Sequence, residues 1–203
     1  GGGQEKPNAG QHRLVLQNER VRVFHVLLPP GAVSQWHEHR LDGLSVRIGD
    51  AAIRDEPVGE AAEEVSVRRG AVSFAATPVV FTHRVRNIGV TPFDNVYIEL
   101  LDRPGGETAA GSKEQRPAEF ENDRVRVLRR VLAPGESTGM HAHAADTVAV
   151  LVTSARLQVT QADGTERTLE PGAGAVQWVA AGTTHALRNA GAAAVEIVDV
   201  ELN

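Results

Sequence analysis

The stretches PGAVSQWHEH (30–39) and PGESTGMHAH (134–143) are two copies of one motif, in which P-G is followed after five residues by H-x-H. Each copy is followed by a second histidine-containing segment, HRVRN at 83–87 and HALRN at 185–189. Each half of the chain therefore carries three histidines, two of them one residue apart. Imidazoles clustered in this way are typical ligands of transition metals.

The repeat extends beyond the histidines. NERVRV at 18–23 matches NDRVRV at 122–127, a shift of 122 − 18 = 104 residues, whereas His83 and His185 are separated by 185 − 83 = 102. The first copy therefore has two extra residues, which we expect within 76–82. Internal repetition of this kind indicates two domains of similar length.

The segment from 102 to 118 is rich in glycine, proline and charge, which is typical of a linker. We therefore predict an N-terminal tail at 1–11, a first domain at 12–101, a linker at 102–118 and a second domain at 119–203. Each domain is long enough to bury a core of its own.

Charge and hydropathy exclude several classes of partner. The chain has 203 residues, a net charge of −5 and a pI near 5.9, so it lacks the basic surface expected of a nucleic-acid-binding protein. No apolar run approaches the roughly 18 residues needed to span a membrane. We expect a soluble globular protein whose partner is a small molecule.

The absence of cysteine excludes disulfides and thiolate ligands. Any metal must then be held by imidazole, carboxylate or water, and iron, nickel, manganese, copper and zinc all remain candidates. The chain begins GGGQEKPNAG without an initiator Met or an apolar signal segment. This fits either a cytoplasmic protein or a processed protein of the cell envelope or periplasm.

The local patterns are those of β-strands. Polar and apolar residues alternate in RLVLQ (13–17), RVRVFHVLL (20–28) and VYIELL (96–101), and again in the second half. Turn signals separate these runs, among them PPG at 29–31 and Asp-Gly at 163–164. No stretch has a helical period, so we predict an all-β protein built from barrels or jelly rolls.

The pattern G-x5-H-x-H at 31–39 and 135–143 resembles the first motif of the cupin superfamily. The segment 174–189, G-x5-A-x-G-x2-H-x3-N, resembles its second motif, with Ala180 in place of the usual Pro. In the first copy H-x3-N at 83–87 is present but the preceding P-x-G is missing, which favours the second copy as the more complete site. Two copies resemble a bicupin of the small bacterial type, which implies two tandem cupin-type β-barrels (double-stranded β-helix or jelly-roll domains).

The resemblance also implies the ligands. Residues at positions i and i+2 of a strand point to the same face, so both histidines of each H-x-H can face the barrel interior. The third histidine would come from a facing strand. The implied metal ligands are His37, His39 and His83 in the first domain, and His141, His143 and His185 in the second.

Both copies depart from the family pattern. Many metal cupins have a Glu four or five residues after the second histidine, where this chain has Gly43 or Leu44, and Thr147 or Val148. Neither copy therefore supplies the usual carboxylate.

An Asp lies three residues after the second histidine in each copy, at Asp42 and Asp146. This odd offset turns it away from the metal on an unbroken strand, so we expect a turn or second-shell role for it. Gln35 shares the face of His37 and could line the pocket. His12 is expected to be an ordinary surface or strand residue.

Three neutral imidazoles leave the charge of a divalent transition metal uncompensated, which favours an anionic ligand. The resemblance implies a three-His metal-dependent oxidoreductase, dioxygenase-like, acting on a small anionic organic substrate. The alternatives are a non-catalytic metal or small-molecule binding bicupin and a metal-dependent isomerase. No general base can be placed in either pocket from the sequence. Exposed sheet edges would allow a homodimer.

Overall fold

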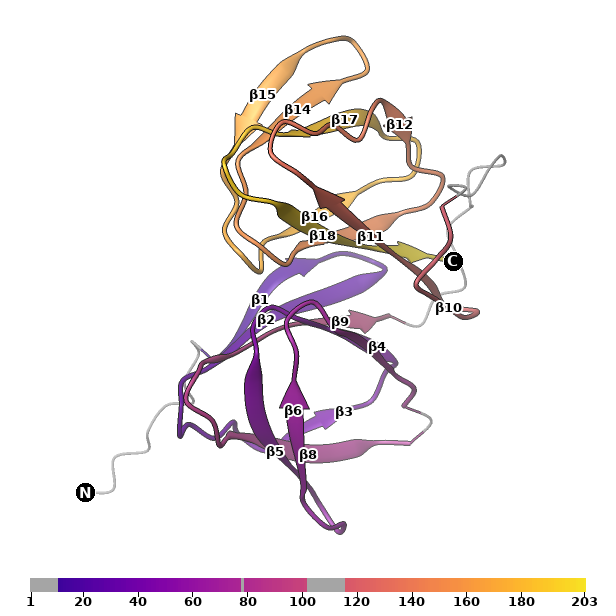
Figure 1. The fold of residues 1–203 in the computed structure, drawn as a ribbon. Coiled ribbons are helices and arrows are strands. Elements are labelled where there is room, and N and C mark those ends of the chain that lie inside the picture. The colour runs from indigo at the N-terminus through magenta and orange to yellow at the C-terminus, as the bar shows by residue number, and fades with distance from the viewer. Residues whose placement is uncertain (1–10, 78, 102–115) are drawn as a thin grey trace, which may run out of the picture. The chain divides into compact units, whose positions relative to one another are not determined.

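The computed structural model describes residues 11–77, 79–101 and 116–203. The chain divides into two compact units, Gly1–Asp102 and Arg103–Asn203 (Figure 1). The described residues form strands and no helix, which confirms the all-β prediction. Most of the predicted tail (1–11) and linker (102–118) lies outside the described residues, so the exact domain limits stay a prediction.

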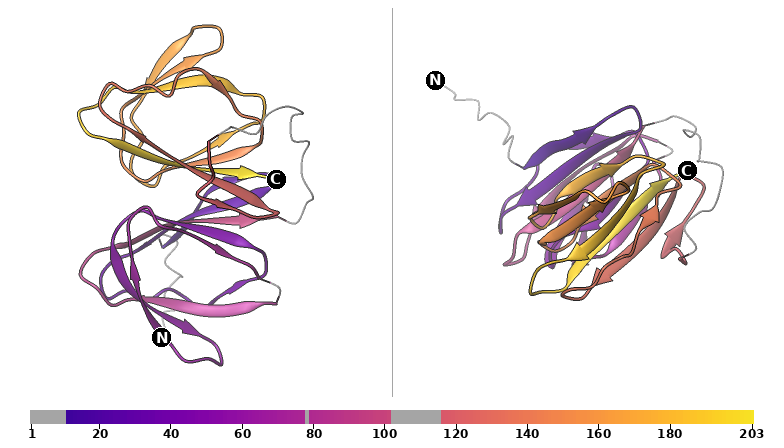
Figure 2. Two further views of the ribbon diagram at one scale, coloured as in Figure 1. Left: turned by 45° about the vertical axis from the view of Figure 1, so that its right-hand side comes forward. Right: turned by 90° about the horizontal axis from the view of Figure 1, so that it is seen from above.

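The first unit contains two antiparallel sheets that face each other around a common interior (Figure 2). The five-stranded sheet has the order β1-β2-β9-β4-β7, and the four-stranded sheet has the order β3-β8-β5-β6. The strands are β1 (His12–Gln17), β2 (Val21–Leu28), β3 (His37–His39), β4 (Gly43–Arg47), β5 (Ala51–Pro57), β6 (Glu63–Val67), β7 (Val72–Ala75), β8 (Phe81–Asn87) and β9 (Phe93–Leu100).

The second unit repeats this topology strand for strand. Its sheets have the orders β10-β11-β18-β13-β16 and β12-β17-β14-β15, so each strand corresponds to the one nine places earlier. The strands are β10 (Phe120–Glu121), β11 (Val125–Leu132), β12 (His141–Ala142), β13 (Thr147–Leu151), β14 (Leu157–Gln161), β15 (Glu166–Leu169), β16 (Val176–Val179), β17 (Thr184–Asn189) and β18 (Val195–Leu202).

Strand alternation sends one set of side chains into the interior of each unit. In β2, for example, Val26 and Leu28 face inward and are 5% and 0% exposed. The core of the first unit comprises Val26, Leu28, Ala51, Ile53, Val67 and Phe93. That of the second comprises Leu132, Leu151, Leu157, Val195 and Ile197.

The two extra residues of the first copy can be placed from the backbone contacts. Asp42 Oδ1 accepts a hydrogen bond from the Thr77 N–H at 2.8 Å. Asp146 Oδ1 accepts the equivalent bond from Ala181 at 2.9 Å. Since 181 − 77 = 104, the shift is still 104 at this point and falls to 102 by His83. The insertion therefore lies between Thr77 and His83, on the approach to β8.

An asparagine fixes the end of each strand that carries the third histidine. Asn87 Nδ2 donates to the carbonyls of Leu28 (3.0 Å) and Thr91 (2.8 Å). Its Oδ1 accepts from the Gly89 N–H at 3.0 Å. Asn189 makes the equivalent three bonds in the second unit. Both asparagines are buried, and their bonds to the carbonyls of Leu28 and Leu132 are shielded from water.

Candidate metal centres

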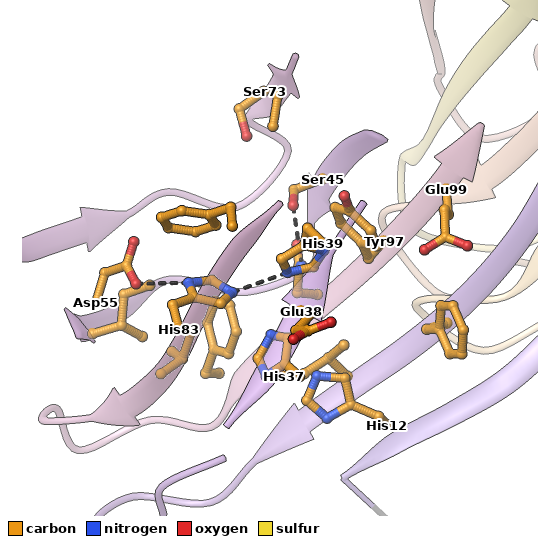
Figure 3. A pocket seen from close by; sticks show the side chains of 18 of the residues that line it. His12, His37, Glu38, His39, Ser45, Asp55, Ser73, His83, Tyr97 and Glu99 are labelled. Carbon is orange, nitrogen blue, oxygen red and sulfur yellow. Dashed lines mark hydrogen bonds and ion pairs between the residues drawn. The ribbon is translucent and has the colours of Figure 1, made fainter. Parts of the chain in front are cut away.

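Strand pairing brings the three histidines of each unit together. His37 and His39 lie on β3, and His37 is directly opposite His83 on β8. In the second unit His141 is opposite His185 in the same way. The ligating atoms of each group lie within 4.8 Å of one another. Figure 3 shows the first group from close by, with His37, His39 and His83 on one side of a pocket.

The nitrogen positions fit a metal ion. Nε2 of His39 and Nε2 of His83 are 3.0 Å apart, and His143 and His185 repeat this separation. Two nitrogens that each lie about 2.1 Å from one ion, at roughly a right angle, are about 3.0 Å apart. Each triad is therefore suited to a divalent transition metal.

One histidine in each triad is oriented by a backbone carbonyl. Nδ1 of His37 lies 2.8 Å from the carbonyl of Gln35, and Nδ1 of His141 lies 3.0 Å from that of Gly139. A proton donated from Nδ1 leaves the lone pair of Nε2 free for a metal. Gln35 thus contacts His37 through its main chain, and it also lines the cavity of the first unit.

A carboxylate orients the third histidine of the first triad only. Asp55, on β5, accepts a hydrogen bond from Nδ1 of His83 at 2.7 Å (Figure 3). Asp55 pairs with Val85 in the sheet, whereas the equivalent pair in the second unit is Val159 with Leu187. Asp55 was not among the sequence predictions, because its partner is 28 residues away and only the strand register brings them together.

Asp42 and Asp146, for which a turn or second-shell role was predicted, lie in the loops after β3 and β12. Their carboxylates accept backbone N–H bonds from Thr77 and Ala181. These bonds join the loop after each H-x-H to the segment that leads to the third histidine. The carboxylate bonded to an imidazole of the first triad is that of Asp55.

A cavity of about 800 Å³ lies between the two sheets of the first unit and is bordered by its triad. This volume is within the range of small-molecule sites. Its apolar wall includes Phe24, Val26, Leu28, Ile53, Val85 and Phe93. Its polar lining includes Ser45, Arg47, Asp55, Ser73, Asn95, Tyr97 and Glu99. The interior thus offers apolar walls and a small number of polar groups.

Tyr97 occupies the space that a side chain at position 43 would need. A Cβ placed on Gly43 would lie 2.5 Å from Tyr97 Cζ and closer still to its hydroxyl. The Tyr97 ring packs against His39, with ring centroids 4.9 Å apart. Position 43, one of the two at which many metal cupins have a Glu, is therefore a glycine covered by a tyrosine from the paired strand β9.

His12 also lies in the cavity, although the sequence indicated an ordinary surface or strand residue. Its ring centroid is 5.1 Å from that of His37 (Figure 3). It comes from β1, before the first motif, so motif spacing could not reveal it. Tyr97, Asp55 and Glu99 likewise place acid–base groups in a pocket where the sequence allowed none to be assigned.

Burial favours the neutral forms of His39 and His185. It lowers the pKa of His39 to about 4, with further lowering by the neighbouring His37 and His83. Burial, then the charge of His141 and Arg130, lowers the pKa of His185 to about 4. The neutral form is the one that binds a metal.

The Tyr97 hydroxyl stays protonated. Burial, followed by the charges of Glu99 and Asp42, raises the pKa of Tyr97 to about 12. At neutral pH this group is a neutral hydrogen-bond donor beside the triad.

Four positions that are polar in the first unit are apolar in the second. The strand register and the shifts of 104 and 102 relate Ser45, Arg47, Asp55 and Asn95 to Ala149, Leu151, Val159 and Ile197. Leu151, Val159 and Ile197 are buried. Arg130 and Asp199 form an ion pair at 3.7 Å, with side chains 11% and 8% exposed. The two triads are alike, but their surroundings differ.

The chain is similar to known proteins in sequence and in fold. Residues 128–201 match the family model described as Cupin domain. No curated protein sequence matches the chain. None of the described segments forms a helix long and apolar enough to cross a membrane.

Several solved structures share the fold. AerE from Microcystis aeruginosa is 10% identical with a TM-score of 0.65, over 95% of this chain and 97% of that one. Oxalate decarboxylase from Bacillus subtilis, in a study of its Mn(II) centres, is 14% identical with a TM-score of 0.58, over 90% of this chain and 69% of that one. A cupin domain from Bordetella pertussis Tohama I is 26% identical with a TM-score of 0.40, over 43% of this chain and 90% of that one.

Two antiparallel barrels, each with three converging imidazoles, define a metal-binding protein with the cupin fold carried twice. Residues 128–201 match the Cupin domain model, and the chain shares the fold of AerE and oxalate decarboxylase, as the resemblance of its H-x-H motifs to cupins implied.

Proposed function

We propose that the chain is a metal-dependent enzyme in which the first unit carries out the reaction, a dioxygenase-like oxidation of a small anionic organic substrate. The observation that carries this proposal is the position of the first triad, which borders a cavity of about 800 Å³. In this assignment His37, His39 and His83 are the metal ligands of the reacting site. His141, His143 and His185 are the ligands of a second metal site.

The charge balance supports an anionic substrate. Three neutral imidazoles contribute no negative charge, and Gly43 and Leu44 stand at the two positions where many metal cupins have a Glu. A divalent ion held by such a set retains its full charge, so an organic anion is a favourable additional ligand. Oxalate decarboxylase, which shares the fold, is named for a small carboxylate and contains Mn(II) centres.

The residues of the pocket have separate tasks in this proposal. Asp55 holds the His83 ring in place through its 2.7 Å hydrogen bond. Tyr97 can donate a hydrogen bond to an oxygen of the substrate, because its hydroxyl stays protonated at neutral pH. The apolar wall excludes water from the reacting atoms. A divalent metal would supply Lewis acidity and, if redox-active, one-electron chemistry with O2.

One observation favours a second candidate, a metal-dependent isomerase. Asp55, Tyr97 and Glu99 all line the cavity and could transfer protons without any redox change. For the second unit, a non-catalytic metal-binding role is favoured, since Leu151 and Ile197 belong to its core.

Metal analysis of protein purified without added ions tests the proposal. We expect close to one ion per intact triad, and a single ion in either His37→Ala or His141→Ala. Iron, copper or manganese in the first site, with O2 consumption that His37→Ala abolishes and His141→Ala retains, would support the oxidoreductase. Zinc or nickel without O2 consumption would favour the isomerase. Failure of both triads to take up metal, even after its addition, would exclude both enzymes.

A further inference from the structure

Arg47 and Asn95 form a polar pair that lines the first cavity. They lie directly opposite each other on β4 and β9, and both line the cavity. Arg47 lies two residues beyond Ser45, which corresponds to roughly 6–7 Å along the strand. The three histidines lie on β3 and β8, so this pair is a separate part of the pocket lining.

The guanidinium of Arg47 has no anionic partner. Within residues 11–77, 79–101 and 116–203, no hydrogen bond or ion pair reaches this group. It lies 5.5 Å from the centroid of the Phe93 ring. Burial lowers the pKa of Arg47 and the charge of Asp55 raises it, but the Asp55 carboxylate is bonded to His83. Since a guanidinium stays charged in proteins, Arg47 places in the cavity a cation that no hydrogen bond or ion pair within the described residues neutralises, with Asp55 acting on it at longer range.

Asn95 has an unused acceptor in the same place. Its side chain is 5% exposed, and its Oδ1 is buried without a hydrogen-bond partner in the described structure. Its Nδ2 makes a long bond of 3.3 Å to Ser45 Oγ. Buried acceptors are usually paired, so an unpaired one that borders a cavity indicates a donor supplied by a ligand.

The second unit shows that the fold does not need this pair. Leu151 and Ile197 hold the equivalent positions and pack in the core. Where the second unit has an interior arginine, Arg130, that residue is paired with Asp199. The free cation and the free acceptor are therefore particular to the first cavity.

We propose that Arg47 and Asn95 bind a small organic acid that carries an O–H or N–H donor next to its carboxylate. The Arg47 guanidinium binds the carboxylate, for which its planar fork is suited. Asn95 Oδ1 accepts the adjacent donor, and the apolar wall that includes Phe24 and Phe93 covers the rest of the molecule. This inference rests on the proposed function, since it assigns the substrate class of the same cavity.

Calorimetric titration of the full chain, with its metal content measured, tests this assignment. The probes are mandelate, which has a carboxylate, a hydroxyl and an apolar ring; mandelamide, which lacks the charge; and phenylacetate, which lacks the hydroxyl. We expect the wild type to bind mandelate at least tenfold more tightly than either of the other two. Arg47→Gln should weaken mandelate binding at least tenfold, and Arg47→Lys should weaken it less.

Matched variants separate the possible outcomes. Arg54→Gln removes an exposed arginine of β5 and should leave mandelate binding unchanged. Asn95→Ile, which introduces the residue found in the second unit, should remove the preference for mandelate over phenylacetate. Thermal melts establish that each variant is folded.

The result that overturns the proposal is mandelate binding that is undetectable in the wild type, or equal in folded Arg47→Gln and wild type. Metal content is read separately. A chain without metal that still binds mandelate through Arg47 would refute the proposed function and retain this inference. Metal bound to the chain together with mandelate binding that does not depend on Arg47 would refute this inference and retain the proposed function.

Discussion

The carboxylate of Asp55 accepts a hydrogen bond from Nδ1 of His83 at 2.7 Å. Partners of this kind orient a metal-bound imidazole and increase its basicity, and their loss typically reduces metal affinity 10- to 100-fold. We therefore expect Asp55→Ala to weaken the first metal site by about 10- to 100-fold. Asp55→Asn, which keeps an acceptor but loses the charge, should have a smaller effect.

Competition titration with a chromophoric chelator would measure this change in a His141→Ala background, so that only the first site is read. Asp55→Ala in a His37→Ala background is the control, and the second site should keep its affinity there. Equal affinity of the first site with and without Asp55 would contradict the assignment.

Gly43 is expected to tolerate no larger side chain beneath Tyr97. A Cβ at this position would lie 2.5 Å from Tyr97 Cζ, so Gly43→Ala must displace the ring or the strand. Overpacking of this kind costs about 1–3 kcal/mol in the free energy of unfolding. Urea denaturation would measure the loss, and the double variant with Tyr97→Ala should recover part of it. If the losses of unfolding free energy of the two single variants simply add in the double variant, the two residues do not interact.

The metal-free protein should lose stability as the pH falls from about 6.5 to about 4. Burial lowers the pKa values of His12, His39 and His185 to about 4 from 6.5. In this interval the unfolded chain binds more protons than the folded one, so the free energy of unfolding decreases with falling pH. Below about pH 4 the contribution of these groups is constant.

Urea denaturation of chelator-treated protein at several pH values would give this slope. His39→Gln removes one of the three groups and should make the slope between pH 4 and 6.5 shallower. An identical slope in wild type and variant would show that His39 titrates alike in the folded and unfolded states.

Asn87 should be important for stability although it touches no ligand. Asn87→Ala would leave the carbonyls of Leu28 and Thr91 and the N–H of Gly89 without their partner. An unpaired buried group costs about 1–3 kcal/mol. The bond to Leu28 is the buried one, so we expect a loss of about 1–3 kcal/mol. Asn189→Ala, its counterpart, should cost a similar amount. A loss below about 1 kcal/mol in thermal or urea unfolding would mean that water replaces these bonds.

The fold and the triads could be predicted because their signals are local or repeated. Alternation identified the strands, and the H-x-H spacing placed His37 and His39 on one face. The environment of the triad could not be predicted in the same way. Asp55 reaches His83 through the pairing of β5 with β8, and Tyr97 reaches His39 from the facing sheet across the interior. No short motif records either relationship.

The second copy was favoured from its more complete motif, whereas the cavity of about 800 Å³ lies in the first unit. Motif completeness concerns the loops around the histidines. The character of the pocket depends instead on inward-facing positions such as Arg47 and Leu151, which lie on strands well away from the motif.

Because the surroundings of the two triads differ, the two sites are expected to bind metal with different affinities. The first has the Asp55 carboxylate behind His83, whereas the second has Val159 at that position and the Arg130 guanidinium nearby. Since a supporting carboxylate is worth about 10- to 100-fold in affinity, the first site should fill at lower metal concentration. Over an intermediate range the predominant species would then carry a single ion, and the chain would respond to rising metal supply in two successive steps.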